Sequence, residues 1–108
     1  MADALTPAAF HILLALATGD RHGYGIMKEV LRLSDGGVRL GAGTIYGTLQ
    51  RLIESGLVAE APRAGPRTIN GRHRRYYRIT PKGRDALHGD VARLQSLVRA
   101  ARVLKEAK

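Results

Sequence analysis

Apolar residues recur along most of the chain at intervals of three and four, the spacing that gathers side chains on one face of a helix. This spacing predicts four helices, over residues 7–17, 23–33, 42–55 and 82–105. The first and the last follow a Thr-Pro pair, in which a hydroxyl can cap the helix and proline takes the first helical position. We therefore expect a mostly helical fold.

Two short segments between the third and fourth helices read as strands. They cover residues 57–61 and 75–80, and the polar stretch 62–74 between them is rich in Pro, Gly and Arg, so together they predict a β-hairpin with a long tip. Val38–Leu40 is a candidate for a very short further strand. This order predicts an α+β, mostly helical fold: a winged helix-turn-helix over residues 1–80 and a C-terminal helix over 81–108.

The net charge of the chain indicates what kind of partner it binds. The 108 residues include 18 Lys and Arg against 9 Asp and Glu, a formal net charge of +9. Such a field attracts polyanions, so nucleic acid, an anionic membrane and acidic proteins are the candidates. The longest apolar run falls far short of the roughly 20 residues that cross a bilayer, and the first residues do not resemble a secretory signal. We expect a cytoplasmic protein with no membrane partner.

The third helix carries groups suited to reading DNA. If Ile45, Leu49 and Leu52 face the core, Tyr46 stands at the boundary of the opposite side. That outward side comprises Gly43, Thr44, Gly47, Gln50 and Arg51. Arg can bind guanine through two hydrogen bonds, Gln can pair with adenine, and Thr offers a hydroxyl and a methyl group. The alternative is an ordinary amphipathic helix with a solvated face.

The hairpin carries the densest positive charge. No acidic residue interrupts the segment 63–84, and the nearest acids are Glu60 and Asp85. Guanidinium groups on a hairpin suit phosphate oxygens and an A·T-rich minor groove, and Arg78, Lys82 and Arg84 extend the basic run. The predicted DNA contacts of the hairpin are Arg63, Arg67, Arg72, His73, Arg74 and Arg75. A solvated charge run is the alternative.

The last helix has an apolar stripe that predicts a dimer. About 24 helical residues extend roughly 36 Å, longer than a small domain can cover, and each exposed Leu or Val forgoes about 1.5–3 kcal/mol of burial. A second copy of the chain would cover the stripe and set two reading helices about 34 Å apart, as a palindrome requires. The predicted seam comprises Leu87, Val91, Leu94, Leu97, Val98, Ala101 and Leu104. The alternative is a helix that folds back on its own domain.

Nothing in the sequence indicates catalysis, a cofactor or a metal. Cysteine is absent, which excludes disulfides, thiolate metal sites and cysteine nucleophiles. The histidines stand far apart without ligand spacing. The segment 41–44 lacks the lysine and the length of a phosphate-binding loop. We expect no enzyme activity.

Three motifs of the chain resemble the PadR family of bacterial transcriptional regulators. The first is Gly43-Thr44-Ile45-Tyr46 followed by Leu49, Arg51-Leu52 and Gly56-Leu57-Val58. The second is His22-Gly23-Tyr24-Gly25-Ile26, and the third is Arg75-Tyr76-Tyr77 leading to Thr80-Pro81-Lys82-Gly83. Together they span most of the segment 10–83, and the short C-terminal part is similar to the members with a single dimerisation helix. The chain departs from the family where Gly41-Ala42 replaces Ser-Pro and Gly47 replaces proline.

The resemblance implies a homodimeric repressor of an inverted-repeat operator. It also implies recognition roles for Thr44, Tyr46, Gln50 and Arg51, and a wing made of the arginines around Gly71. Some members release DNA when a small molecule binds near the dimer interface, so a small-molecule effector is a further candidate partner. In this interpretation the protein binds double-stranded DNA and a second copy of itself, and it associates with the nucleoid when bound.

Two other classes of function remain open. One is a winged-helix module that binds protein, although protein interfaces tend to avoid so much unpaired charge. The other is a small basic RNA-binding protein of the ribosomal kind, which usually spreads its charge rather than concentrating it in a hairpin. Binding to duplex DNA across a salt series discriminates between them, because contacts with DNA phosphates make affinity fall steeply with salt.

Overall fold

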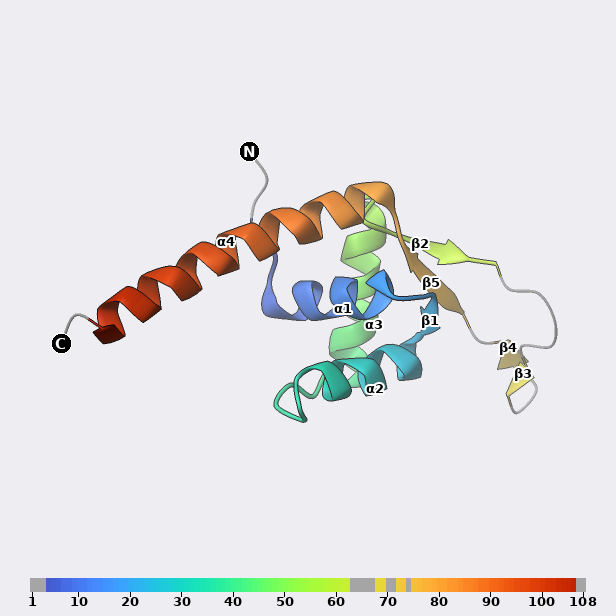
Figure 1. The fold of residues 1–108 in the computed structure, drawn as a ribbon. Coiled ribbons are helices and arrows are strands. Elements are labelled where there is room, and N and C mark those ends of the chain that lie inside the picture. Colours follow the sequence, from blue (N-terminus) through green and yellow to red (C-terminus); the bar gives the residue numbers. More distant parts are fainter. Residues whose placement is uncertain (1–3, 63–67, 70–71, 74, 107–108) are drawn as a thin grey trace.

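The predicted helices and hairpin form at the expected places in the computed structural model, which describes residues 4–62, 68–69, 72–73 and 75–106. The helices are α1 (Pro7–Ala17), α2 (Gly23–Leu33), α3 (Ala42–Glu54) and α4 (Pro81–Glu106). The strands are β1 (Arg21–His22), β2 (Val58–Ala61), β3 (Thr68–Ile69), β4 (Arg72–His73) and β5 (Tyr76–Ile79). The result is a winged helix-turn-helix with a long C-terminal helix (Figure 1).

Local capping fixes where the helices begin and end. The Thr6 hydroxyl accepts the Ala9 N–H at 3.1 Å and caps α1. His22 caps α2, because its Nδ1 accepts the Gly25 N–H at 3.0 Å. Gly56 follows α3 with φ of 79°, a left-handed conformation that glycine adopts without strain. The C-terminal glycine predicted for the third helix thus lies at the turn into β2.

The hairpin belongs to a small antiparallel sheet in which β5 is the central strand. The strand order is β1-β5-β2, with Arg21 opposite Tyr77 and Val58 opposite Ile79. β3 and β4 pair with each other as a separate two-stranded ribbon. Sequence reasoning missed β1, because two residues beside a helix start carry no strand periodicity.

Val38–Leu40 forms no strand, so that expectation was wrong. The segment runs as an extended loop into α3. Leu40 packs in the core with 9% exposure, and the Val38 N–H donates to the Ser34 hydroxyl at 2.9 Å. Its apolar residues serve as anchors of a loop, a role that periodicity cannot distinguish from a short strand.

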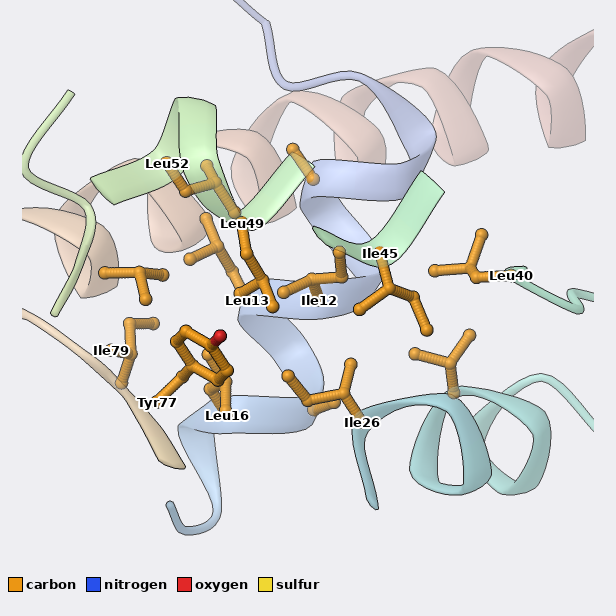
Figure 2. Packing of buried hydrophobic residues seen from close by; sticks show 14 of the residues in the cluster. Ile12, Leu13, Leu16, Ile26, Leu40, Ile45, Leu49, Leu52, Tyr77 and Ile79 are labelled. Atoms are coloured by element: carbon orange, nitrogen blue, oxygen red, sulfur yellow. The ribbon is translucent and has the colours of Figure 1, made fainter. Parts of the chain in front are cut away.

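The hydrophobic core is assembled around α1 (Figure 2). Its largest fully buried side chains are Ile12, Leu13, Leu16, Ile26, Val30 and Leu49. Side chains alternate along β5, so Tyr77 and Ile79 point into the core while Arg78 is exposed. Tyr77 is therefore the buried member of the tyrosine pair, a choice that the sequence left open, and Tyr76 is half-buried.

The first turns of α4 belong to the packed domain. Gly83, Leu87 and Asp90 are buried. The Asp90 carboxylate accepts the Leu5 N–H at 3.3 Å and the Arg93 Nε–H at 3.2 Å. The predicted boundary between residues 80 and 81 coincides with the start of α4, but packing across that boundary is continuous. The remainder of α4 projects beyond α1, and the β3–β4 ribbon lies at the other end of the molecule (Figure 1).

Candidate nucleic-acid interface

The predicted reading face of α3 is open to solvent. Ile45, Thr48, Leu49 and Leu52 are buried against the rest of the fold. On the opposite side Gly43, Thr44, Gln50 and Arg51 are exposed, Gly47 is half-buried, and Tyr46 retains 51% exposure. The helix therefore has the orientation that its apolar spacing predicts.

The glycines at the start of α3 are not required by packing. A Cβ atom at Gly41 or Gly43 would meet nothing within 4 Å, and one at Gly47 would meet only Arg51 Nη1 at 3.9 Å. Gly41 is also the N-cap and makes no side-chain capping bond. The start of α3 consequently presents bare backbone that another molecule can approach closely.

Tyr46 lies against the first residue of α2. A Cβ atom at Gly23 would overlap the Tyr46 hydroxyl and would lie 2.6 Å from its Cζ. A side chain at position 23 would displace the phenol, so Gly23 leaves the room that this contact needs. Sequence reasoning did not assign this role to Gly23, whose partner is more than twenty positions away in the chain.

Among the described residues, the side chains of Gln50 and Arg51 form hydrogen bonds only within α3. Gln50 Nε2 donates to Glu54 Oε2 at 3.1 Å, and Arg51 Nη2 donates to the Thr48 hydroxyl at 3.3 Å. Arg51 stands on the flank of α3 that faces the start of α4, where it borders an open groove of about 680 Å³. Both side chains are exposed, so a stronger ligand can replace their present partners.

Only some of the hairpin's predicted DNA contacts lie within the described residues. Arg63, Arg67 and Arg74 lie outside them. Arg72 and His73 are described as the backbone of β4, without their side chains. Arg75 is described in full, with a side chain 75% exposed.

Acidic residues from other elements neutralise part of the basic run. Glu60 on β2 approaches Arg75 at 3.8 Å, and Asp20 binds Arg78 Nη2 at 2.8 Å and its Nε at 3.3 Å. Lys82 and Arg84 instead donate to backbone carbonyls at the ends of α3 and α1. Sequence reasoning could not find Asp20, which is 58 positions from Arg78, whereas Glu60 lies on the partner strand of the predicted hairpin.

Tyr77 connects the base of the hairpin to α3. Burial raises the pKa of the Tyr77 hydroxyl above its ordinary value, the nearby Tyr46 and Glu60 raise it further, and Arg75 acts in the opposite direction. The Tyr46 phenol on α3 rests on Gly23, and the preceding residue, His22, pairs with Tyr76 at the base of the hairpin. The outward side of α3 and the base of the hairpin are thus neighbours in space.

The apolar stripe of α4 divides into two parts. Leu87 was predicted at the dimer seam, but it is only 3% exposed and belongs to the core of its own domain. The reason is that the first turns of α4 pack against α1 and β5. Val91 and Leu94 are half-buried, and the exposed members are Leu97, Val98, Ala101 and Leu104, with exposures of 49–74% for the three larger side chains. Val103, which the sequence analysis omitted, is 63% exposed.

The part of the chain that the structure describes contains no cluster of three or more His, Asp or Glu that could hold a metal ion. None of its helices combines the length and the apolar character needed to span a membrane.

Comparison with known proteins identifies the family. Residues 12–89 match the model of the PadR-like family of transcriptional regulators. A transcriptional regulator of Mycobacterium tuberculosis is 42% identical over 89 residues, which cover 82% of this chain and 77% of that protein. These proteins are regulators of transcription rather than enzymes.

Solved structures agree with this family. A transcriptional regulator from Clostridium thermocellum superposes with a TM-score of 0.73 at 26% identity, covering 88% of this chain and 86% of that one. A PadR family regulator from Eggerthella lenta gives a TM-score of 0.69 at 28% identity, covering 90% and 82% of the two chains. On the strength of the family match and the Mycobacterium relative, this chain belongs to the PadR-like family of transcriptional regulators.

Proposed function

We propose that the protein binds duplex DNA in a sequence-specific manner, as a homodimer that represses transcription from an inverted-repeat operator. The observation that carries this proposal is the exposed side of α3 beside the base of the basic hairpin. Tyr46 on α3 rests on Gly23, and the preceding residue, His22, pairs with Tyr76 at the base of the hairpin, so the two parts lie close together. A regulator that works on DNA would act in the bacterial cytoplasm, at the nucleoid.

The two parts of this surface would have different tasks. Thr44, Gln50 and Arg51 on α3 would contact base edges in the major groove, and the bare backbone at Gly43 and Gly47 would let the helix enter it closely. The predicted hairpin contacts would hold phosphates and the adjacent minor groove, and they supply affinity rather than sequence information. They are Arg63, Arg67, Arg72, His73, Arg74 and Arg75.

The exposed end of α4 supports the homodimer. In the single chain Leu97, Val98 and Leu104 have exposures of 49–74%. Full burial would stabilise each of them by about 1.5–3 kcal/mol. An isologous contact between two copies would cover them and impose two-fold symmetry on the DNA site. An inverted repeat is the sequence that such symmetry reads.

A groove at this proposed interface supports a small-molecule effector. It has a volume of about 450 Å³ and lies between α1 and α4. Its walls combine apolar and cationic side chains, namely Phe10, Val91, Leu94, Gln95, Val98, Arg99 and Arg102. A ligand there would touch both the domain and the dimer helix, so its binding would be coupled to their relative position.

Sequence-specific binding is tested with DNA fragments that the protein enriches from genomic DNA. We expect Arg51→Ala to weaken binding to an enriched site by about 1–3 kcal/mol and to affect a random duplex much less, because a base contact is lost. Lys105→Ala, which removes one positive charge at the far end of α4, is the matched control and should affect both duplexes equally.

Two outcomes would contradict the proposal. Equal losses on enriched and random DNA for Arg51→Ala would show that this part of α3 does not read bases. Tighter binding to RNA of the same length than to duplex DNA, or no salt dependence of DNA binding, would favour an RNA-binding or a protein-binding function instead.

A further inference from the structure

The outer side of α2 carries a positive, aromatic patch to which the proposed function gives no role. Tyr24 is 58% exposed, the most exposed of the described tyrosines. Lys28, one turn further along α2, places its ammonium 5.6 Å from the centre of the Tyr24 ring. Both side chains border a hollow of about 530 Å³, whose walls also include Arg21, His22, Gly25, Glu29 and Arg32.

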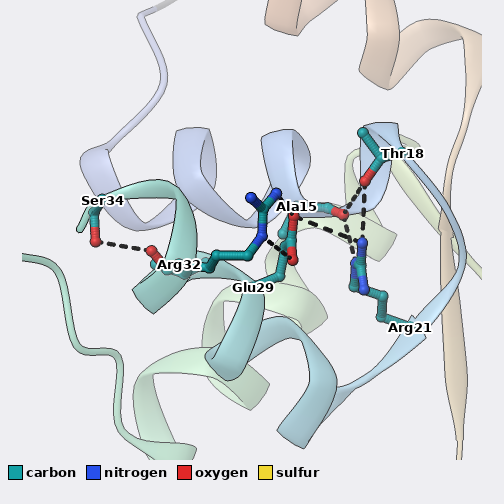
Figure 3. A network of polar contacts seen from close by, with 7 residues as sticks. Ala15, Thr18, Arg21, Glu29, Arg32 and Ser34 are labelled. Atoms are coloured by element: carbon teal, nitrogen blue, oxygen red, sulfur yellow. Dashed lines mark hydrogen bonds and ion pairs between the residues drawn. The ribbon is translucent and has the colours of Figure 1, made fainter. Parts of the chain in front are cut away.

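The charges of this patch are not all balanced. The Glu29 carboxylate binds Arg32 Nη2 at 2.6 Å and approaches Arg21 Nη2 at 3.7 Å (Figure 3). Arg21 also donates to the Ala15 carbonyl at 2.8 Å and to the Thr18 hydroxyl at 3.1 Å. The one acid of the hollow is thus engaged by two arginines. Lys28 has no carboxylate within ion-pair distance among the described residues, so its charge remains available to an anion.

A ladder of rings holds the patch in position. The Tyr76 ring on β5 meets the edge of His22 at 5.2 Å between centroids, and the His22 ring stacks on Tyr24 at 6.5 Å with an angle of 11°. His22 is itself fixed as the cap of α2. The Tyr24 phenol and the Lys28 ammonium beside it are therefore connected to the base of the hairpin by one stacked and one edge-on ring contact.

The patch also adjoins α3. Tyr24 directly follows Gly23, whose backbone is in contact with the Tyr46 hydroxyl. Two half-exposed phenols, Tyr24 and Tyr46, thus lie at the start of α2. The patch therefore adjoins α3 through Gly23 and Tyr46, and the base of the hairpin through His22 and Tyr76.

We propose that Tyr24 and Lys28 form a contact site for the DNA backbone, in which the Lys28 ammonium pairs with a phosphate and the Tyr24 hydroxyl donates to a phosphate oxygen. This proposal rests on the proposed DNA-binding function. Lysine and tyrosine are both common donors to phosphate, and such contacts set the orientation of a protein on the duplex without reading its sequence. The site would orient α3 in its groove from the side opposite the start of α4.

The test compares Lys28→Gln with Lys105→Gln. Both variants lose one positive charge from an exposed lysine, so they change the overall field of the protein equally. Affinity for a short random-sequence duplex is measured across a series of salt concentrations. We expect the slope of log K against log salt to become shallower by about 0.9 for Lys28→Gln, the value for one phosphate contact, and to stay near the wild-type value for Lys105→Gln.

Tyr24→Phe provides a second measurement that keeps the ring ladder and the fold. Loss of one hydrogen bond to phosphate should weaken binding by about threefold to tenfold, equally on random and on enriched DNA. A loss confined to the enriched site would assign Tyr24 to base reading and overturn the proposal.

The remaining outcomes separate this proposal from the function on which it rests. If the wild type binds DNA with a steep salt slope and Lys28→Gln matches Lys105→Gln, the backbone site is wrong and the proposed function stands. If the wild type shows no salt-dependent binding to DNA, both fail. A titration with inorganic phosphate alone, monitored through the amide NMR signals of α2, tests whether the site binds a free anion instead. A saturable change in chemical shift that Lys28→Gln abolishes would overturn the assignment to DNA.

Discussion

Gly83 and Gly89 both lie in α4 but meet different surroundings. A Cβ atom at Gly83 would overlap the Leu57 carbonyl oxygen and would lie 2.8 Å from Ile79 Cγ1, whereas one at Gly89 would meet nothing within 4 Å. The bare Cα of Gly83 is what allows the first turn of α4 to rest on the turn after α3. At Gly89 no neighbour of the same chain demands glycine.

We predict opposite effects on stability for alanine at these two positions. Gly83→Ala should lower the free energy of unfolding by about 1–3 kcal/mol or more, because backbone must move to admit the methyl group. Gly89→Ala should raise it by about 1 kcal/mol, the helix propensity that glycine forgoes. Chemical denaturation of the two variants measures both values, and effects of the same sign would contradict this account of Gly83.

Glu29 gives the fold a pH dependence on the acid side. The hydrogen bond from Arg32 lowers the pKa of the Glu29 carboxyl below its ordinary value, desolvation opposes this shift, and the charge of Arg21 adds to it. A carboxyl group whose pKa is lower in the folded state stabilises the fold at pH values above its unfolded pKa of about 4.3. That contribution is lost as the pH falls through the lower, folded pKa.

The matching prediction compares the wild type with Glu29→Gln across pH. The variant should have a lower melting temperature near neutral pH, and the difference should shrink below about pH 4.3 as the wild-type carboxyl becomes protonated. Melting curves followed by circular dichroism give both quantities. A difference that stays constant down to strongly acidic pH would mean that the carboxylate charge does not stabilise this fold.

At the scale of elements, the start of α4 is tied to the ends of two other helices. The Thr80 hydroxyl accepts the Gly83 N–H at 3.0 Å and donates to the Gly56 carbonyl at 2.7 Å. Lys82 Nζ donates to the Ser55 carbonyl at 2.9 Å, and Arg84 Nη2 donates to the Ala17 carbonyl at 3.3 Å. Cations at the carbonyl ends of α3 and α1 also oppose the negative end of each helix dipole.

Thr80 and Thr6 allow this connection to be measured. Both cap a helix through their hydroxyl groups, but among the described residues the Thr6 hydroxyl bonds only to Ala9, within its own helix start. Thr6→Ala should cost about 1 kcal/mol, the usual value of a cap. Thr80→Ala should cost about 1 kcal/mol more, because the bond to the end of α3 is lost as well. Equal costs in denaturant titrations would show that the bond across the helices adds nothing to stability.

At the scale of the whole molecule, the long α4 leaves the chain with an uncovered apolar end. The dimensions of the fold are 60 × 31 × 22 Å, and the C-terminal part of α4 extends past the packed domain (Figure 1). Because Leu87 completes the core, the proposed seam begins at the half-buried Val91 and continues to Leu104. The dimer would then form largely beyond the domain, by contact between helices.

We predict that the wild type sediments with the mass of two chains. Leu97→Glu and Leu104→Glu should shift it to a single chain at micromolar concentration, because a buried carboxylate in an apolar seam is costly. Ser96→Glu adds the same charge on the side of α4 away from the stripe and should leave the dimer intact. A monomeric wild type, or a dimer in all three variants, would contradict this seam.

The order of the four helices and of the two main hairpin strands, the bounds of α1 and α2 and the outward side of α3 follow from the sequence alone. The reason is that each depends on local rules: helical periodicity, a capping hydroxyl before proline, and glycine after the last helical residue. The short motifs around Gly43–Tyr46 identify the family for the same reason, since each is contiguous in the chain. The hairpin and the length of α4 were likewise predictable from composition and spacing.

Tertiary structure decided what depends on contacts between distant segments. It paired Arg21–His22 with β5, buried Tyr77 rather than Tyr76, and brought Asp20 and Glu60 to arginines that no local acid balances. It also placed Leu87 in the core, although Leu87 and Leu104 belong to the same apolar stripe. Periodicity shows which residues share a face of a helix, but only the packed neighbours determine how much of that face the domain covers.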